Sequence, residues 1–152
     1  MLKISAQLLT QIEAHGAASY PFEGCGLLLG TMVKGVNTVT ALFPVENSWP
    51  NEAEKPERFL IAPQEMLRAE MAALRADVDV IGIFHSHPDH PPIASPRDLA
   101  WATWPNYSYL ITEVREGKPG VSRAWQLTDA RDGFDEQPVR VAMRNSNGEK
   151  HA

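Results

Sequence analysis

The stretch that most constrains the fold is Val78–Phe84, a near-continuous apolar run of strand length. Such a run is typical of a β-strand that is covered on both faces. Pro63 is expected to begin the preceding helix, because proline suits the first helical position. The apolar face of that helix is expected to comprise Met66, Leu67, Met71 and Leu74. A buried strand beside an amphipathic helix predicts a layered α/β domain.

Other elements are expected on both sides of this run. Hydrophobic spacing predicts a helix over residues 4–17, with Gly16 as its stop. A second helix is expected to begin at Ser95-Pro96 and to end at Pro105. Alternating or apolar stretches predict strands over residues 23–30, 36–43, 107–114 and 122–127, and residues 57–61 are compatible with a short one. These elements predict a mixed central sheet with helices packed against it.

The length of 152 residues fits one domain, which we expect to span residues 1–130. Residues 131–144 are expected to add an edge strand to it, and residues 145–152 to form a disordered tail. Residues 44–58 contain three prolines, two asparagines and four glutamates, so they predict a long polar loop. Long loops in compact domains are often functional.

Composition excludes several classes of protein. The net charge is −5, the pI is about 5.5, and no block of basic residues marks a nucleic-acid binder. The single cysteine, Cys25, excludes an intrachain disulfide. No apolar run is long enough for a membrane span, and the N-terminus is amphipathic rather than signal-like. We therefore expect a soluble, cytoplasmic protein.

Two histidines follow the apolar run directly, in the order His85-Ser86-His87-Pro88. Side chains alternate along a strand, so both imidazoles project to one face about 6.6 Å apart along the chain. At that spacing both rings can reach a single ion. The proline-rich loop that follows can bring Asp98 back over them. The sequence therefore predicts a metal site formed by His85, His87 and Asp98.

Two imidazoles and one carboxylate suit zinc, and three protein ligands leave a fourth position for water. This layout is typical of catalytic rather than structural zinc. A base must still take the proton of the water and pass it to a leaving amine. Glu23 is the best candidate, since it precedes an apolar strand and is followed by Gly24 and Gly26, which permit close backbone approach.

These residues together resemble a known family. Glu23, then His85-x-His87-Pro88, six residues, Ser95, two residues and Asp98 resembles the pattern of the JAMM (MPN-plus) zinc metalloproteases. The segment Glu23–Gly30 and the pair Arg58-Phe59 before a proline-led helix are also similar to that family. The resemblance spans roughly residues 4–127 and points to the short, stand-alone prokaryotic type.

The resemblance implies a three-layer α/β/α sandwich like that of cytidine deaminases. It implies zinc on His85, His87 and Asp98, Glu23 as general acid and base, and Ser95 as a hydrogen-bond donor to the oxyanion. Family members cut peptide or isopeptide bonds after the C-terminal glycine of ubiquitin-like or sulfur-carrier β-grasp proteins. The tail of such a protein is therefore the expected substrate and partner, while the exact conjugate stays open.

Each candidate residue also has a simpler interpretation. The two histidines can be polar residues at a strand end, and Glu23 can be a surface glutamate. Ser95 and Asp98 fit a helix N-terminus, where capping and metal ligation are expected to compete for the Asp98 oxygens. The alternative function is a non-catalytic MPN-like scaffold for protein interaction. A zinc deaminase of nucleobases is excluded, because it needs a Cys-x-x-Cys pair.

Overall fold

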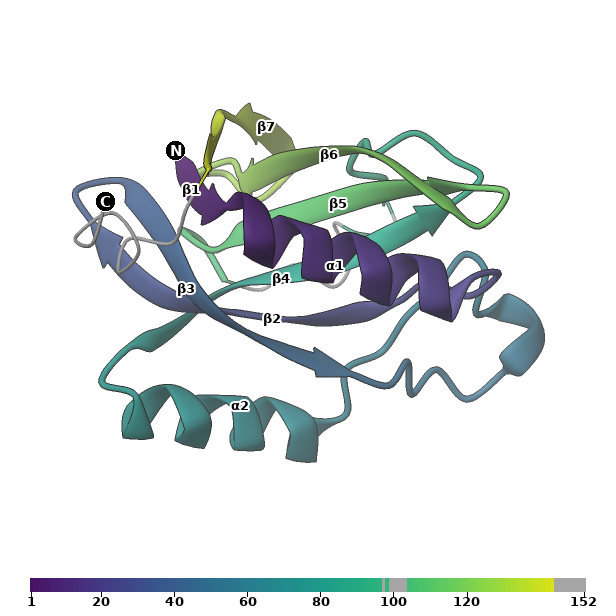
Figure 1. Cartoon of the computed structure of the whole chain (residues 1–152), viewed down its shortest axis with the longest axis horizontal. Coiled ribbons are helices and arrows are strands. Elements are labelled where there is room, and N and C mark those ends of the chain that lie inside the picture. The colour runs from purple at the N-terminus through teal and green to yellow at the C-terminus, as the bar shows by residue number, and fades with distance from the viewer. Residues whose placement is uncertain (97, 99–103, 144–152) are drawn as a thin grey trace.

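The computed structural model describes residues 1–96, 98 and 104–143. In these ranges eight strands form one sheet in the order β7-β6-β5-β4-β2-β3-β1-β8 (Figure 1). The strands are β1 (Leu2–Ser5), β2 (Cys25–Val33), β3 (Val36–Val45), β4 (Asp79–Pro88), β5 (Ser108–Arg115), β6 (Lys118–Leu127), β7 (Phe134–Gln137) and β8 (Val139–Ala142). The helices are α1 (Ala6–Ser19), η1 (Glu52–Glu54) and α2 (Pro63–Arg75). Both parallel and antiparallel pairs occur, so the predicted α/β class with a mixed sheet is confirmed.

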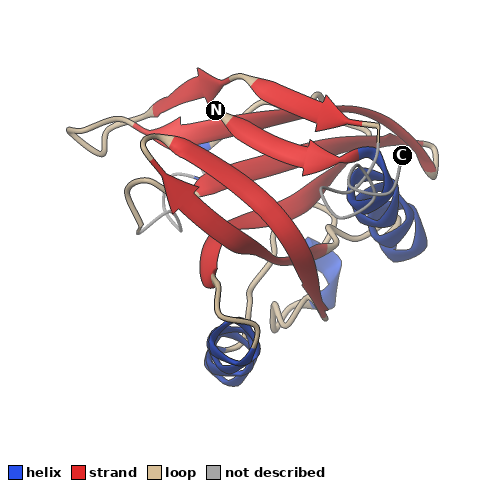
Figure 2. Ribbon diagram, turned by 60° about the vertical axis from the view of Figure 1, so that its left-hand side comes forward, coloured by secondary structure: helices blue, strands red, loops and turns tan. Residues whose placement is uncertain are grey.

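Each face of the sheet has its own hydrophobic cluster and its own helix. Leu27 and Leu29 of β2 pack in a cluster that contains Ala69 of α2. Leu28, which points to the opposite face, packs in the cluster that contains Ile12 of α1. Figure 2 shows the twisted sheet and the two long helices lying apart from each other. The sheet is therefore covered on both faces, as the apolar run of β4 predicts.

Helix α1 starts later and ends later than the hydrophobic spacing predicts. Ser5 caps its first turn, with its side chain accepting from the N–H of Leu8, while Ile4 belongs to β1. Gly16 was expected to stop the helix, but the helix continues to Ser19. A Cβ at Gly16 would lie 3.1 Å from Cβ of Ser86. The glycine therefore serves close packing of α1 on β4 rather than termination.

The predicted apolar face of α2 is wrong. Ala69 and Ala73 are the buried residues of α2, and Met66 packs beside them. Three other large side chains that were predicted to face the core are 45–79% exposed: Leu67, Met71 and Leu74. Small side chains let the helix approach the sheet closely, so side-chain size rather than hydrophobicity selects the inner face.

Strand β4 lies near the middle of the sheet and extends further than the apolar run. It pairs antiparallel with β2 from Asp79 to His85 and parallel with β5 from Gly82 to Pro88. His85 and His87 therefore belong to the strand, as the alternation argument requires. Residues 57–61 form no strand. No helix within the described ranges is long and apolar enough to cross a bilayer.

The C-terminal part contributes two strands at opposite edges of the sheet. β8 pairs with β1 where an edge strand was expected, and β7, which the sequence did not indicate, pairs with β6. The predicted tail at 145–152 and the body of the helix expected to end at Pro105 lie outside the described residues.

Candidate metal centre

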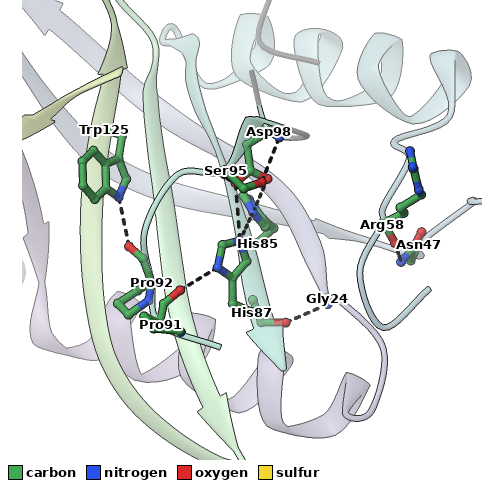
Figure 3. Close-up of polar contacts among 11 residues, drawn as sticks. Gly24, Asn47, Arg58, His85, His87, Pro91, Pro92, Ser95, Asp98 and Trp125 are labelled. Atoms are coloured by element: carbon green, nitrogen blue, oxygen red, sulfur yellow. Dashed lines mark hydrogen bonds and ion pairs between the residues drawn. The ribbon is translucent and has the colours of Figure 1, made fainter. Parts of the chain in front are cut away.

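Three potential ligands converge on one point, in agreement with the spacing of the sequence. His85 and His87 come from β4, and Asp98 comes from the segment that follows the proline-rich loop (Figure 3). Nε2 of His85 lies 3.2 Å from Nε2 of His87 and 3.1 Å from Oδ1 of Asp98. Nε2 of His87 lies 3.5 Å from Oδ2 of Asp98. Within the described residues this is the group of side chains that can hold a metal ion.

These separations fit a tetrahedral ion. Ligands bound at about 2.0–2.1 Å in a tetrahedron are about 3.3–3.4 Å apart, and the separations of His85 Nε2 from His87 Nε2 and from Oδ1 of Asp98 are close to this value. Each of the three is poorly exposed, with side-chain accessibilities of 2% for His85, 9% for His87 and 12% for Asp98. The two histidines do lie at a strand end, as the simpler interpretation has it, but they are buried there beside a carboxylate.

A second contact orients the ring of His87. Its Nδ1 lies 2.8 Å from the carbonyl oxygen of Pro91, and because a carbonyl only accepts, Nδ1 carries the proton. Nε2 of the same ring is directed toward His85 and Asp98. A hydrogen bond of this kind commonly fixes the tautomer of a metal-binding histidine. Nδ1 of His85 is buried and has no hydrogen-bond partner among the described residues.

The protonation states also suit metal binding. Burial lowers the pKa of His85, while the nearby Asp98 carboxylate opposes that change. For Asp98, burial disfavours the charged form, but the rings of His85 and His87 and the N–H of Ser95 outweigh it and hold its pKa below the usual range. A neutral imidazole beside an ionised carboxylate is the form in which both groups bind metals.

Ser95 and Asp98 also cap a helical turn, which confirms the capping interpretation of this pair. The N–H of Ser95 donates to Oδ2 of Asp98 at 2.7 Å, and the N–H of Asp98 donates to Oγ of Ser95 at 3.2 Å. This reciprocal pattern is a capping box. The expected competition between capping and metal ligation for the Asp98 oxygens stays a prediction; in the structure Oδ2 is engaged by Ser95, while Oδ1 is directed at His85.

Contacts distant in sequence hold the loop that returns Asp98 to the histidines. The indole N–H of Trp125 donates to the carbonyl of Pro92 at 3.0 Å, next to the carbonyl that binds His87 (Figure 3). At the start of the loop, Asp89 accepts from the hydroxyl of Tyr20 at 2.7 Å and from the N–H of Glu116 at 2.8 Å. No local sequence pattern indicates the contact of Trp125 with Pro92.

Glu23 lies two residues before the start of β2 and is only 5% exposed, so its interpretation as a surface glutamate is wrong. The next residue ties it to the histidine strand: the N–H of Gly24 donates to Oγ of Ser86 at 2.8 Å, and the N–H of Ser86 donates to Gly24 O at 2.9 Å. A Cβ at Gly24 would lie 2.6 Å from Oγ of Ser19, so the expected close approach occurs here. Ser86 was not recognised in the sequence, although it separates the two histidines.

Two depressions meet at the ligands. A cleft of about 520 Å³ has Glu23, His87 and Ser95 in its lining, together with Glu57 and His90. An apolar cavity of about 210 Å³ reaches the other side, and its lining includes His85, Asp98, Phe59, Ile83, Tyr109 and Phe134. The structure therefore brings Glu23 and Ser95 into one cleft with a ligand, while Glu23 stays separate from the ligand group itself.

Comparison with known proteins gives three informative relatives. A desampylase of Haloferax volcanii is 36% identical over 104 residues, which cover 68% of this chain and 71% of the relative. A probable TtuB-protein conjugate cleaving protease of Thermus thermophilus is 32% identical over 132 residues, covering 87% and 80%. A CysO-cysteine peptidase of Mycobacterium tuberculosis is 27% identical over 141 residues, covering 93% and 91%.

Solved structures and a family match agree with these relatives. A protein of Desulfitobacterium hafniense superposes with a TM-score of 0.83 at 28% identity and 97% coverage of both chains. A JAB1/MPN domain protein of Archaeoglobus fulgidus, at 20% identity, has the same fold with a TM-score of 0.59, over 93% of this chain and 97% of that protein. The family described as prokaryotic homologs of the JAB domain matches residues 5–128. The chain therefore belongs to the prokaryotic JAB-domain family.

Proposed function

We propose that the protein is a zinc metallopeptidase that hydrolyses the bond after the C-terminal glycine of a ubiquitin-like or sulfur-carrier β-grasp protein. The observation that carries this proposal is the convergence of His85, His87 and Asp98, with Glu23 and Ser95 lining the cleft that His87 also lines. Three ligands leave one coordination position open to solvent or substrate. A non-catalytic scaffold gives no reason for such a ligand set.

Zinc is the proposed metal because of the donor set. Two imidazole nitrogens and one carboxylate oxygen at tetrahedral separations suit zinc better than magnesium or calcium, which prefer six or more oxygens. When bound, zinc supplies Lewis acidity, which polarises a carbonyl and lets water ionise near neutral pH.

Glu23 is the proposed general acid and base. Its carboxylate lines the cleft shared with His87, and its burial excludes bulk water that would compete for the proton. It takes a proton from the attacking water and delivers it to the nitrogen of the leaving group. The amide bond breaks, the water oxygen remains on the glycine carboxylate, and the leaving group departs as an amine.

Ser95 is the proposed stabiliser of the oxyanion. Its oxygen accepts a hydrogen bond from the N–H of Asp98, so the hydroxyl proton remains available to donate into the cleft. Donors held at the position where negative charge develops stabilise the transition state strongly. The capping box keeps this hydroxyl in place without any movement during the reaction.

The substrate class follows from the relatives together with the cleft. The names of the three relatives describe a desampylase, a protease that cleaves TtuB-protein conjugates, and a peptidase of CysO-cysteine. A site between the two depressions accommodates an extended tail more readily than a folded surface.

We extend the proposal to a three-layer α/β/α sandwich of the cytidine-deaminase type, a catalytic domain over residues 1–130, and a cytoplasmic location.

The proposal is tested with two defined conjugates. A β-grasp sulfur-carrier protein ending in Gly-Gly is prepared with either lysine or cysteine attached to its terminal carboxylate through an amide bond. Mass spectrometry is expected to show loss of the attached residue with the zinc-loaded protein, no loss after EDTA treatment, and recovery after zinc is restored. If the zinc-loaded protein leaves both conjugates intact, the proposed activity is wrong.

A further inference from the structure

We infer that Asn47 is a positioning residue that fixes Glu23 next to the metal ligands. The inference rests on the proposed function for the role of Glu23, but its structural part does not. Asn47 lies in the polar segment between β3 and α2 and was not singled out by any motif. It touches neither a ligand nor the reacting atoms, so it acts through the residues that it holds.

The side chain of Asn47 uses all of its hydrogen-bonding capacity. Its Nδ2 donates to the carbonyl of Glu23 at 3.0 Å and to the carbonyl of Arg58 at 2.9 Å. Its Oδ1 accepts from the N–H of Trp49 at 3.0 Å and from the N–H of Leu60 at 3.2 Å. An amide offers two donor hydrogens and two acceptor lone pairs, and all four are engaged. One side chain therefore joins three separate backbone segments.

Glu23 depends on these bonds because it lies outside the sheet ladder. Strand β2 begins at Cys25, so no neighbouring strand holds the backbone of Glu23. Its N–H donates to the carbonyl of Lys55 at 2.9 Å, and its carbonyl accepts from Asn47. Both backbone polar groups of Glu23 are thus bound by the loop, and the amide of Asn47 is the link that closes this loop against residue 23.

The other hydrogen bonds of Asn47 connect it to the metal ligands through a second segment of the chain. The segment Arg58–Leu60, which it holds at both ends, carries Phe59. The ring of Phe59 stacks on His85 with a centroid distance of 4.6 Å and an interplanar angle of 27°. Asn47 and Arg58 appear together in Figure 3, beside the strand that carries the histidines. Asn47 therefore couples the position of Glu23 to the packing of a ligand.

The reactivity of the Cys25 thiol can be used to measure this arrangement in the absence of substrate. It is the single cysteine of the chain, lies two residues after Glu23, and is fully buried. Its thiol is 3.9 Å from the carbonyl of Glu46, the residue before Asn47. Burial, with a contribution from the charge of Glu23, raises the pKa of the thiol to about 12, so it reacts slowly while the loop is closed. Release of the loop that contains Asn47 is expected to make the Cys25 thiol react faster.

The experiment compares Asn47→Ala with two matched asparagine variants of the full-length, zinc-loaded protein. Asn37→Ala removes another buried amide, which donates to Asn106 O at 2.9 Å and Ser108 Oγ at 2.8 Å, away from the metal centre. Asn51→Ala removes an exposed amide from the same loop. Asn47→Asp keeps the acceptor oxygen of the side chain but removes the two N–H donors. It is used in place of Asn47→Ala if Asn47→Ala does not fold.

Asn47→Ala is expected to keep one zinc ion and to lower kcat about 10- to 100-fold, since small misplacements of a catalytic group have effects of this size. KM for the lysine conjugate should change less than about twofold, because substrate contacts are unaffected. The reaction of Cys25 with a disulfide reagent in native buffer should become at least about tenfold faster. Asn37→Ala should lower the midpoint of urea unfolding, while kcat and the rate of the Cys25 reaction stay near the wild-type values.

The inference is overturned if Asn47→Ala has the kcat of the wild type and its Cys25 reacts at the wild-type rate. It is also overturned if Asn37→Ala changes both rates as much as Asn47→Ala does, because general loss of stability then explains the effect. If the wild-type protein hydrolyses neither conjugate, the proposed function fails, whereas the Cys25 measurement still decides whether Asn47 holds the segment of Glu23.

Discussion

Replacing Glu23 with glutamine is expected to lower kcat for the lysine conjugate by about 10²–10⁴-fold, the usual contribution of a positioned acid or base. Glutamine has nearly the same shape, so the buried site of residue 23 is preserved, but its amide cannot accept a proton from water. The metal ligands come from other segments of the chain. The variant should therefore still bind one zinc ion.

Zinc content is measured by elemental analysis, and turnover is followed by mass spectrometry of the conjugate. Glu52→Gln, an exposed glutamate in η1, is the matched control and should behave as the wild type. Undiminished turnover in Glu23→Gln would remove Glu23 from the mechanism. Loss of zinc together with activity would instead show that the substitution had damaged the site.

Replacing Asp98 with asparagine is expected to weaken zinc binding by more than the roughly 10- to 100-fold that follows loss of an outer-shell partner. The change removes the negative charge and leaves one oxygen, which must serve either the N–H of Ser95 or the metal. At present Oδ2 accepts from Ser95 and Oδ1 faces His85. Conflict between the two roles adds to the loss of charge.

Competition with a chromophoric chelator measures this affinity. Asp129→Asn, a control at an exposed position outside the cleft, should retain the wild-type zinc affinity. Unchanged zinc binding in Asp98→Asn would mean that Asp98 is no ligand and that the third donor lies elsewhere. Removal of the carboxylate should also abolish hydrolysis, so activity and affinity are expected to fall together.

The histidine pair could be predicted from sequence because it depends only on the geometry of one strand. Alternation fixes the side to which His85 and His87 point, and the apolar run identifies the strand as buried. The position of Asp98 had no such local basis, because the proline-rich loop permits its return without dictating it. Its return depends on distant contacts, such as Trp125 with Pro92.

The errors in the fold have a common cause, which is packing between distant segments. Leu67, Met71 and Leu74 satisfy the hydrophobic pattern of a buried helix face, yet the alanines of α2 allow the closer approach to the sheet. Residues 57–61 resemble a strand, but their backbone groups bind the side chain of Asn47 rather than a neighbouring strand. Hydrophobic periodicity carries no information on either contact.

The convergence of three ligands on one zinc ion is tested most directly by diffraction at the zinc absorption edge from crystals of the zinc-loaded protein. We expect one anomalous peak about 2.0–2.1 Å from Nε2 of His85 and of His87 and about 2.0–2.2 Å from a carboxylate oxygen of Asp98, with one further ligand that is not protein. A zinc ion bound elsewhere, or a fourth protein ligand that closes the coordination sphere, would contradict the proposed catalytic site.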